Sequence, residues 1–212
     1  MKKILVSALV VAASVSAFAQ GKVTFANDPA NLASPPDRFV RYDSTAATLN
    51  PAYVSGDRVF SNGAAGLRAQ LYFGASTADA GSLNAVSTAP TTFRVSTSAN
   101  RGSWFSVADI VLPGTPAGST VNLQVRVWDI NLASSYEAAT AMGAGYTGLI
   151  GTSLIFQYTV QIDPLATPAQ YVGGNNNPGV LTSFMIGTVP EPSTIVLAGL
   201  GAAALLIFRR RK

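Results

Sequence analysis

Thr120-Val-Asn-Leu-Gln-Val-Arg-Val-Trp128 is the stretch that decides the fold, because apolar and polar side chains alternate along its whole length. A period of two residues is typical of a β-strand with one buried face. The face expected to be buried carries Val121, Leu123, Val125 and Val127. The opposite face carries Asn122, Gln124, Arg126 and Trp128. We therefore predict a half-buried strand over residues 120–128.

Other short runs have a strand-like composition, and Gly, Pro and Asn separate them. They are Lys22–Ala26, Arg38–Tyr42, Leu67–Phe73, Phe93–Val95, Trp104–Leu112, Ser153–Ile162 and Leu181–Ile186. In the run 153–162, the side chains expected to point inward are Leu154, Phe156, Tyr158, Val160 and Ile162. A parallel α/β sheet would need helices between its strands, and the sequence offers only one. We predict an all-β fold, an antiparallel β-sandwich of jelly-roll-like form.

The one helical segment is Ser134–Met142, which is rich in Ala. Ser134 or Ser135 would cap its start, and Glu137 lies in its first turn. Gly143 would end it, because Gly is favoured just after the last helical turn. We expect this short helix to lie over a face or an end of the sheets.

Residues 1–19 have the three parts of a secretory signal peptide. Lys2-Lys3 is the charged start, and Ile4–Val15 is an apolar core too short to span a membrane. The expected cleavage site is formed by Ala17 and Ala19 ahead of Gln20. The export translocon and signal peptidase are therefore expected partners, and the mature protein should begin at Gln20.

Three parts follow one another at the C-terminal end. The first is Val189, Pro190, Glu191, Pro192 and Ser193, which the two prolines should keep stiff and extended. The second is the apolar run Ile195–Phe208, predicted with Thr194 to form a helix over 194–208. Its length of roughly 21 Å falls short of a hydrocarbon core of about 30 Å, so it is a marginal membrane span. The third is the basic cluster Arg209, Arg210, Arg211 and Lys212, expected to stay in the cytoplasm.

This order closely resembles the PEP-CTERM sorting signal of Gram-negative bacteria. The resemblance rests on residues 189–193, the short apolar helix and the Arg-rich end, within a segment 188–212. It implies processing near the Pro-Glu-Pro triplet by exosortase, an integral-membrane enzyme, and release to the cell surface or an extracellular polysaccharide matrix. Before processing, the tail would hold the protein in the inner membrane, with the β-sandwich domain 20–187 in the periplasm. An ordinary single-pass anchor is the alternative.

The composition excludes several classes of function. The chain has no Cys and no His, which excludes disulfides, Cys/His zinc sites and His-dependent catalytic triads. The net charge of +4 arises in the two terminal segments, because residues 20–189 carry eight basic and nine acidic groups. No basic stripe is present, so we expect no nucleic-acid partner.

Two motif-like stretches carry no chemistry. Gly143-Ala-Gly145-Tyr-Thr-Gly148 has the spacing of a dinucleotide-binding loop, but that motif needs a strand before it and a helix after it. Here the expected order is the reverse, and the stretch is interpreted as a loop. Gly151-Thr-Ser153 resembles part of a nucleophile elbow, but position 155 is not Gly and no His can act as the base.

Three ligand classes stay open. Two carboxylates could hydrolyse a glycoside without His, but the nine acids of the body show no paired spacing. Calcium could be held by Asp129-Ile-Asn131 and Asn27-Asp28, although such residues in turns usually bond their own backbone. Trp128 could contact a glycan, unless the predicted helix or a loop covers it and makes it part of the core. Trp104 is expected in the core.

The function expected from these features is non-catalytic. We expect an exported surface or matrix protein with a structural or adhesive role, no cofactor and no enzymatic activity. The alternative is a carbohydrate-binding module that attaches to exopolysaccharide, and a membrane-tethered hydrolase is the least favoured class.

Overall fold

The computed structural model describes residues 20–27, 37–60, 66–94, 100–160 and 181–189. The predicted signal peptide, the Pro-Glu-Pro stretch, the apolar helix and the basic end lie outside these ranges. Within them, no helix is both long enough and apolar enough to cross a membrane.

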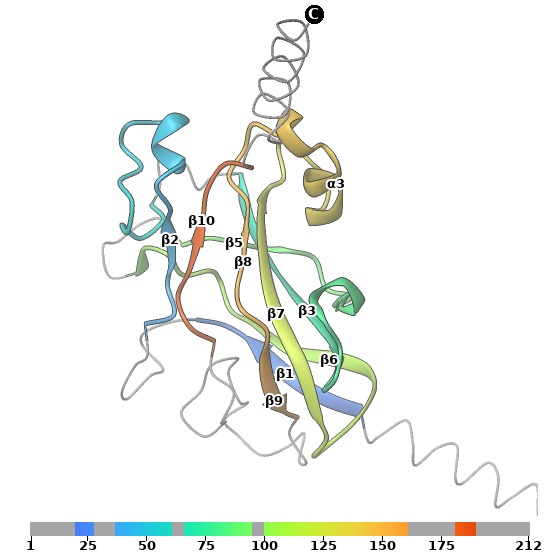
Figure 1. The fold of residues 1–212 in the computed structure, drawn as a ribbon. Coiled ribbons are helices and arrows are strands. Elements are labelled where there is room, and N and C mark those ends of the chain that lie inside the picture. Colours follow the sequence, from blue (N-terminus) through green and yellow to red (C-terminus); the bar gives the residue numbers. More distant parts are fainter. Residues whose placement is uncertain (1–19, 28–36, 61–65, 95–99, 161–180, 190–212) are drawn as a thin grey trace, which may run out of the picture.

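Two long antiparallel strands form the centre of the fold (Figure 1). They are β3 (Leu67–Ala75) and β7 (Thr120–Asp129), paired from Leu67 opposite Asp129 to Ala75 opposite Val121. Four short strands extend this sheet: β4 (Asn84–Ala85) and β5 (Thr91–Thr92) pair with β3, and β8 (Gly151–Thr152) and β9 (Phe156–Thr159) pair with β7. The predicted strand 120–128 is confirmed, but every residue from 121 to 128 is buried, so both of its faces are covered.

Two smaller strand pairs complete the β structure. β1 (Gln20–Phe25) pairs antiparallel with β6 (Val107–Pro116), and β2 (Val40–Tyr42) pairs parallel with β10 (Phe184–Ile186). The prediction of a mostly β chain with antiparallel sheets is confirmed, and the β2–β10 pair is a parallel exception. A parallel pair needs a long connection between its strands, and most of the chain separates β2 from β10. The jelly-roll-like sandwich itself stays a prediction.

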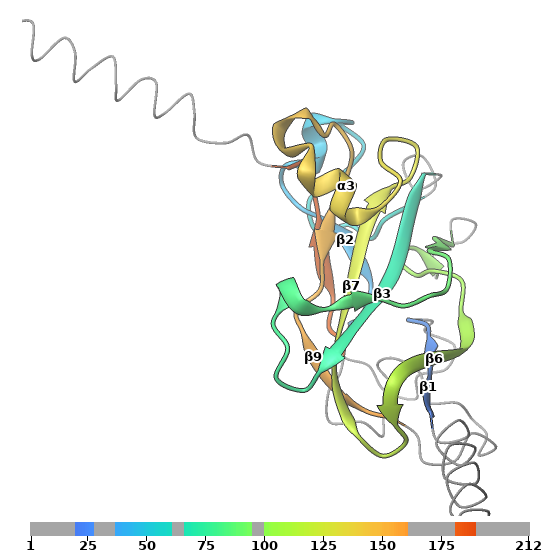
Figure 2. The same ribbon diagram turned by 90° about the vertical axis from the view of Figure 1, so that its right-hand side faces the viewer.

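One face of the central sheet bears the main hydrophobic core. The four apolar side chains predicted to be buried, at positions 121, 123, 125 and 127, all belong to it. The two smaller pairs pack on this face through Val23, Ile110, Val40 and Ile186. Figure 2 shows β1 and β6 on one side of β3 and β7, and the turn between β3 and β4 on the other.

The opposite face is covered by helical turns. The α-helix α3 (Tyr136–Ala141) and the 3-10 helix η3 (Ala80–Ser82) lie over this face, and both bond to Arg126. The 3-10 helix η5 (Gly143–Gly145) follows α3, whereas η2 (Ala46–Thr48) lies beside the main core, which includes Ala46. The helix prediction is confirmed: the Ser135 side chain caps α3 by accepting a hydrogen bond from the Ala138 N–H at 3.1 Å. Gly143 follows with a φ of +54°, which favours Gly.

Three strand predictions are wrong in detail. Phe93 forms only an isolated bridge with Trp104, and the strand predicted from Trp104 begins at Val107. Leu154 was expected to point inward but is 77% exposed. It lies in the gap between β8 and β9, where the alternation of a single strand does not apply. Ile162 lies outside the described residues.

Candidate functional site at the C-terminal junction

The chain is tightly held where it leaves the body for the sorting segment. After β10, Gly187 and Ile150 exchange two backbone hydrogen bonds, of 3.0 and 2.8 Å. The next amide, of Thr188, donates to the Thr45 Oγ1 at 2.9 Å. Because successive residues are bonded to different segments, the polypeptide is fixed as far as position 188.

Gly187 is required by a close approach of Asp43. A Cβ at position 187 would lie 2.0 Å from the Asp43 Oδ2, a distance that no real contact reaches. The same carboxylate caps η2, because its Oδ1 accepts from the Thr45 N–H at 2.7 Å and from the Ala46 N–H at 3.1 Å. The Asp43 carboxylate therefore joins the η2 segment to the junction and fixes their relative position.

A second hydrophobic cluster receives the last described residue. Trp128, Ala133, Ala139 and Tyr146 form its buried part, and Val189 packs against it. The Trp128 indole Nε1 donates to the Ala133 carbonyl at 3.0 Å, and its side chain is 0% exposed. Of the two alternatives for Trp128, the structure shows the buried one: α3 and the adjoining turns cover the side chain, which leaves no surface for a glycan. Trp104 is also fully buried, as predicted.

Arg126 forms a polar cluster between the sheet and α3. Its Nη1 donates to the Glu137 Oε1 at 3.0 Å, and its Nε donates to the Gln124 Oε1 at 3.0 Å. The guanidinium also lies 3.9 Å from the ring centroid of Tyr72, whose hydroxyl donates to the Glu137 Oε2 at 3.1 Å. Arg126 is 9% exposed, so this pairing compensates a charge that is almost fully desolvated.

Burial sets the protonation of the tyrosines in this cluster. It raises the pKa of Tyr72, and the neighbouring Glu137 raises it further. Burial also raises the pKa of Tyr136, whose ring lies 5.1 Å from the Arg126 guanidinium. Both phenols therefore stay neutral over a wide pH range, and Tyr72 acts as a hydrogen-bond donor. The cluster attaches α3 to the sheet.

The candidate calcium ligands have other bonds. The Asp129 Oδ1 accepts from the Asn131 N–H at 2.9 Å, as expected of a turn residue. Asn27 is buried, and its side chain donates to the Arg38 and Gly102 carbonyls and accepts from the Trp104 N–H. Asp28 lies outside the described residues. Within the ranges that the structure covers, no group of three or more acidic, His or Cys side chains gathers to hold a metal.

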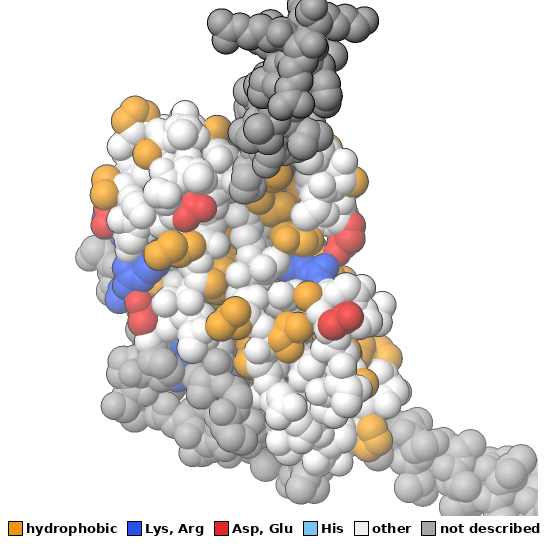
Figure 3. Space-filling view, viewed as in Figure 1, with side chains coloured by type: hydrophobic (Ala, Val, Ile, Leu, Met, Phe, Trp, Pro, Cys, Tyr) orange, Lys and Arg blue, Asp and Glu red, His pale blue; other side chains and the backbone are white. Residues whose placement is uncertain are grey.

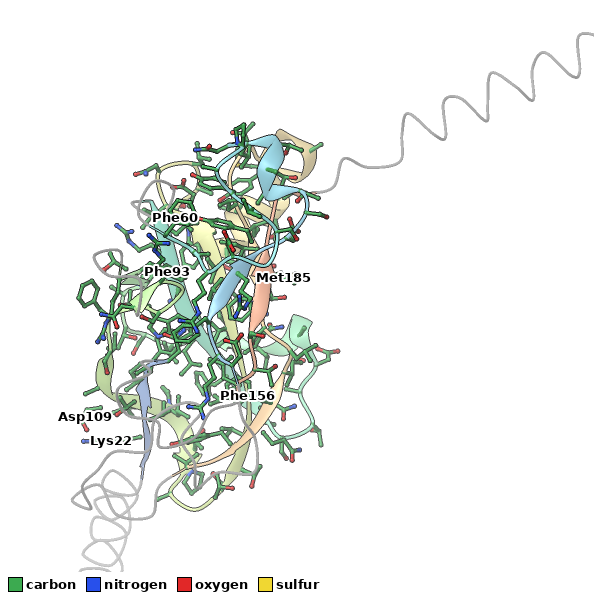
Figure 4. The ribbon with its side chains drawn as sticks, turned by 90° about the vertical axis from the view of Figure 1, so that its left-hand side faces the viewer. Lys22, Phe60, Phe93, Asp109, Phe156 and Met185 are labelled. Carbon is green, nitrogen blue, oxygen red and sulfur yellow. The ribbon has the colours of Figure 1, made fainter. Side chains whose placement is uncertain are left out.

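Other carboxylates cap turns or pair with basic groups. The Asp79 carboxylate accepts hydrogen bonds from the Ser82 hydroxyl and from the Ser82 N–H, the latter at 2.9 Å, and caps η3. The hydroxyl bond, together with the N–H bond, lowers the pKa of the Asp79 carboxyl. Asp37 accepts from the Arg41 Nε at 2.9 Å. Lys22 lies 3.8 Å from Asp109 at the β1–β6 pair (Figure 4). Several of the nine carboxylates considered for glycoside hydrolysis are therefore engaged in turns or ion pairs.

The two motif-like stretches are structural. Gly143–Gly145 forms the 3-10 helix η5 rather than a plain loop. It lies between α3 and β8, so the order of elements is the reverse of that in a dinucleotide-binding motif, as expected. The Ser153 hydroxyl is buried; it accepts from the Val125 N–H at 2.9 Å and donates to the Leu154 carbonyl at 2.7 Å. It therefore bridges β7 to the segment after β8.

Comparison with known proteins identifies the segment that follows this junction. Residues 188–212 match the family model of the PEP-CTERM protein-sorting motif. The chain carries a PEP-CTERM motif. This motif implies export, processing by exosortase and a destination at the cell surface or outside the cell. No curated protein and no solved structure matches the chain.

The sequence did not reveal that the body holds the start of the motif. Thr188 and Val189, the first residues of the motif segment, are bonded to or packed against elements far apart in the sequence. The nearest sequence signal was the absence of a spacer, because only Gly187 separates β10 from the motif match.

Proposed function

We propose that this protein is a non-catalytic surface or matrix component, delivered through its PEP-CTERM motif to a structural or adhesive role. The observation that carries the proposal is the motif at 188–212, which begins one residue after β10, the last strand among the described residues. The bonds of Asp43, Asp79 and Glu137 support a structural role, because these carboxylates cap helices or neutralise Arg126.

In the proposed route, the signal peptide of residues 1–19 directs export and is removed before Gln20. The tail then holds the protein in the inner membrane, with residues 20–187 as a periplasmic domain, until exosortase acts near Pro190. Arg209–Lys212 keep the C-terminal end in the cytoplasm during this stage, since Arg and Lys resist transfer across a bilayer.

The test is the intact mass of the protein in each cell fraction of its native host. We expect a mass from Gln20 to a residue near Pro190, recovered from the surface or the medium. Replacing Pro190, Glu191 and Pro192 together with Ala should retain the full tail in the membrane fraction. Pro51→Ala, at an exposed turn of the body, is the control and should be processed normally. A wild-type mass from Gln20 to Lys212, found only in membranes, would contradict the proposal.

The non-catalytic role has its own test. A broad glycosidase and esterase screen of the mature protein should show no activity. A hydrolase activity that one Asp→Asn substitution abolishes would contradict the non-catalytic role and support the membrane-tethered hydrolase.

Attachment to exopolysaccharide is a second candidate, favoured by one exposed aromatic side chain. Phe105 is 53% exposed, and the Arg94 guanidinium lies 5.5 Å from its ring centroid. Exposed aromatic faces are suited to contact with sugar rings, whereas Trp128 is buried. Saturable binding on a glycan array that is lost in Phe105→Ala would support the carbohydrate-binding module, and no binding to any glycan would exclude it.

A further inference from the structure

The exposed apolar side chains of the body are unevenly distributed. Among the described residues, eight large hydrophobic side chains are exposed, and five of them lie in segments 43–57 and 129–150. These five are Leu49 at 42%, Val54 at 55%, Ile130 at 37%, Leu132 at 44% and Met142 at 47%. The other three, Phe105, Leu154 and Met185, lie elsewhere on the strands and loops.

The two segments lie at the same end of the molecule, on either side of the junction. Thr188 is bonded to Thr45 in the first segment, and Val189 packs against the cluster that includes Ala133 and Ala139 in the second. Figure 1 shows the η2 segment and α3 at this end, and Figure 3 shows hydrophobic side chains over both among mostly uncharged surface. We call the exposed surface of these two segments the exit face.

The distance from the exit face to the apolar tail is short. Val189 is held in the body, and the apolar run begins at Ile195. The six Cα–Cα steps from Val189 to Ile195 span at most about 22 Å when fully extended. The headgroup region on one side of a bilayer takes up about 5–7 Å of that distance. A tail inserted in a membrane therefore brings the exit face close to the lipid surface.

Charge attraction does not explain such a contact. The two segments contain no Lys or Arg and four carboxylates, of Asp43, Asp57, Asp129 and Glu137. Three of them accept hydrogen bonds inside the body. The exit face thus offers apolar side chains and no basic group, which suits contact with lipid through apolar burial.

We propose that the exit face rests on the bilayer that holds the tail, with Leu132 and Met142 at the boundary between headgroups and acyl chains. This inference rests on the membrane-held stage of the proposed function. The apolar side chains are spread over both sides of the junction, which matches a surface surrounding an inserted tail. The contact holds the Pro-Glu-Pro stretch at the membrane surface. The inserted tail and the exit face together fix the orientation of the body relative to the bilayer.

The test uses the chain from Gln20 to Lys212, without the signal peptide, in vesicles of phosphatidylethanolamine and phosphatidylglycerol. The protein has no native Cys, so Leu132→Cys and Met142→Cys each give a single site for an environment-sensitive fluorophore. Ala117→Cys, in the turn between β6 and β7, is the control at the opposite end of β7. We expect a blue shift and quenching by brominated lipids at positions 132 and 142, insensitive to salt, and neither effect at 117.

Lengthening the chain between Val189 and the apolar run tests whether the short connection is what brings the exit face to the lipid. Ten Gly and Ser residues inserted after Val189 should reduce the lipid quenching at 132 and 142 while the chain still floats with the vesicles. A Leu132→Asp change should likewise reduce the quenching at position 142.

The remaining outcomes overturn the inference in distinguishable ways. If the chain floats with vesicles but the labels at 132 and 142 behave like the label at 117, the exit face does not touch lipid and the proposed route still stands. If those labels respond only when exosortase is present in the vesicles, the occupant is the enzyme and not lipid. If the chain does not float, both this inference and the membrane-held stage fail.

Discussion

At the scale of single residues, Gly187 and Asp43 determine how the body meets the sorting segment. The absence of a side chain at position 187 lets the Asp43 carboxylate reach the backbone of the junction while it caps η2. Any Cβ there must displace a carboxylate whose position several hydrogen bonds fix. The junction is therefore sensitive to the smallest substitution.

Gly187→Ala is expected to destabilise the protein by about 1–3 kcal/mol, the usual cost of overpacking a filled site. Gly145→Ala is the matched control, because a Cβ at position 145 meets no atom within 4 Å. Urea denaturation of the two variants compares their free energies of unfolding. Equal stability of both variants would show that Asp43 moves aside without cost.

Tyr42 makes stability depend on alkaline pH. Burial raises its pKa from 10.0 to about 12, against the opposing effect of the Phe60 N–H, which donates to its hydroxyl. The unfolded chain then loses this proton at lower pH than the folded chain does. The free energy of unfolding is unaffected below pH 10.0 and falls between pH 10.0 and about 12. Urea midpoints across this range should fall less steeply in Tyr42→Phe, and identical slopes would contradict the prediction.

At the scale of elements, α3 is short and depends on its cap and its contacts. A helix of six residues has little stability of its own, so the Ser135 cap, the Glu137–Arg126 pair and the packing on Trp128 hold it. The helix in turn keeps Trp128 from solvent.

Ser135→Ala should lower the free energy of unfolding by about 0.5–2 kcal/mol, the usual loss when a helix cap is removed. Ser134→Ala is the neighbouring control, since Ser134 is exposed and does not cap the helix. Amide exchange at Ala138, whose N–H donates to the cap, should speed up in the first variant and not in the second. Equal exchange in both would show that the cap is not needed.

The elements that sequence patterns predict well are those whose signals are local. The alternation over 120–128 depends on neighbouring residues, and so do the start of α3 at the Ser135 cap and its end before Gly143. Both predictions are confirmed. The parallel partner of β10 and the docking of Val189 depend on residues more than thirty positions away, which local periodicity does not report. Trp128 was ambiguous for the same reason, because its face of the strand is polar in sequence and covered only in the fold.

At the scale of the whole molecule, Asn27 connects the first strand to the rest of the body. Its side chain, 1% exposed, bonds to Arg38, Gly102 and Trp104. One amide thus joins the backbone at position 38 to the backbone at positions 102 and 104, more than sixty residues later.

Asn27→Ala should cost at least about 2 kcal/mol, because each buried group left without a partner costs about 1–3 kcal/mol. Asn84→Ala, at an exposed edge strand, should leave stability nearly unchanged. Thermal unfolding of the mature protein measures both changes. A loss in Asn27→Ala no larger than that in Asn84→Ala would mean that water replaces these bonds.

The exchange of hydrogen bonds between Gly187 and Ile150 has a mechanical consequence. A pull on the C-terminal end first reaches Val189 and the Thr188–Thr45 bond. It then reaches the Gly187–Ile150 pair and passes along β10 to the parallel strand β2. Bonds that lie across the direction of a pull share its load and break together, whereas bonds at a peeling edge break singly. Pulling the protein apart from its ends in a single-molecule instrument should therefore give one abrupt rupture, and a gradual extension from the C-terminal side would show that the junction peels. The junction residues that precede the sorting motif would then also carry the mechanical load whenever the protein is tethered by its C-terminal segment.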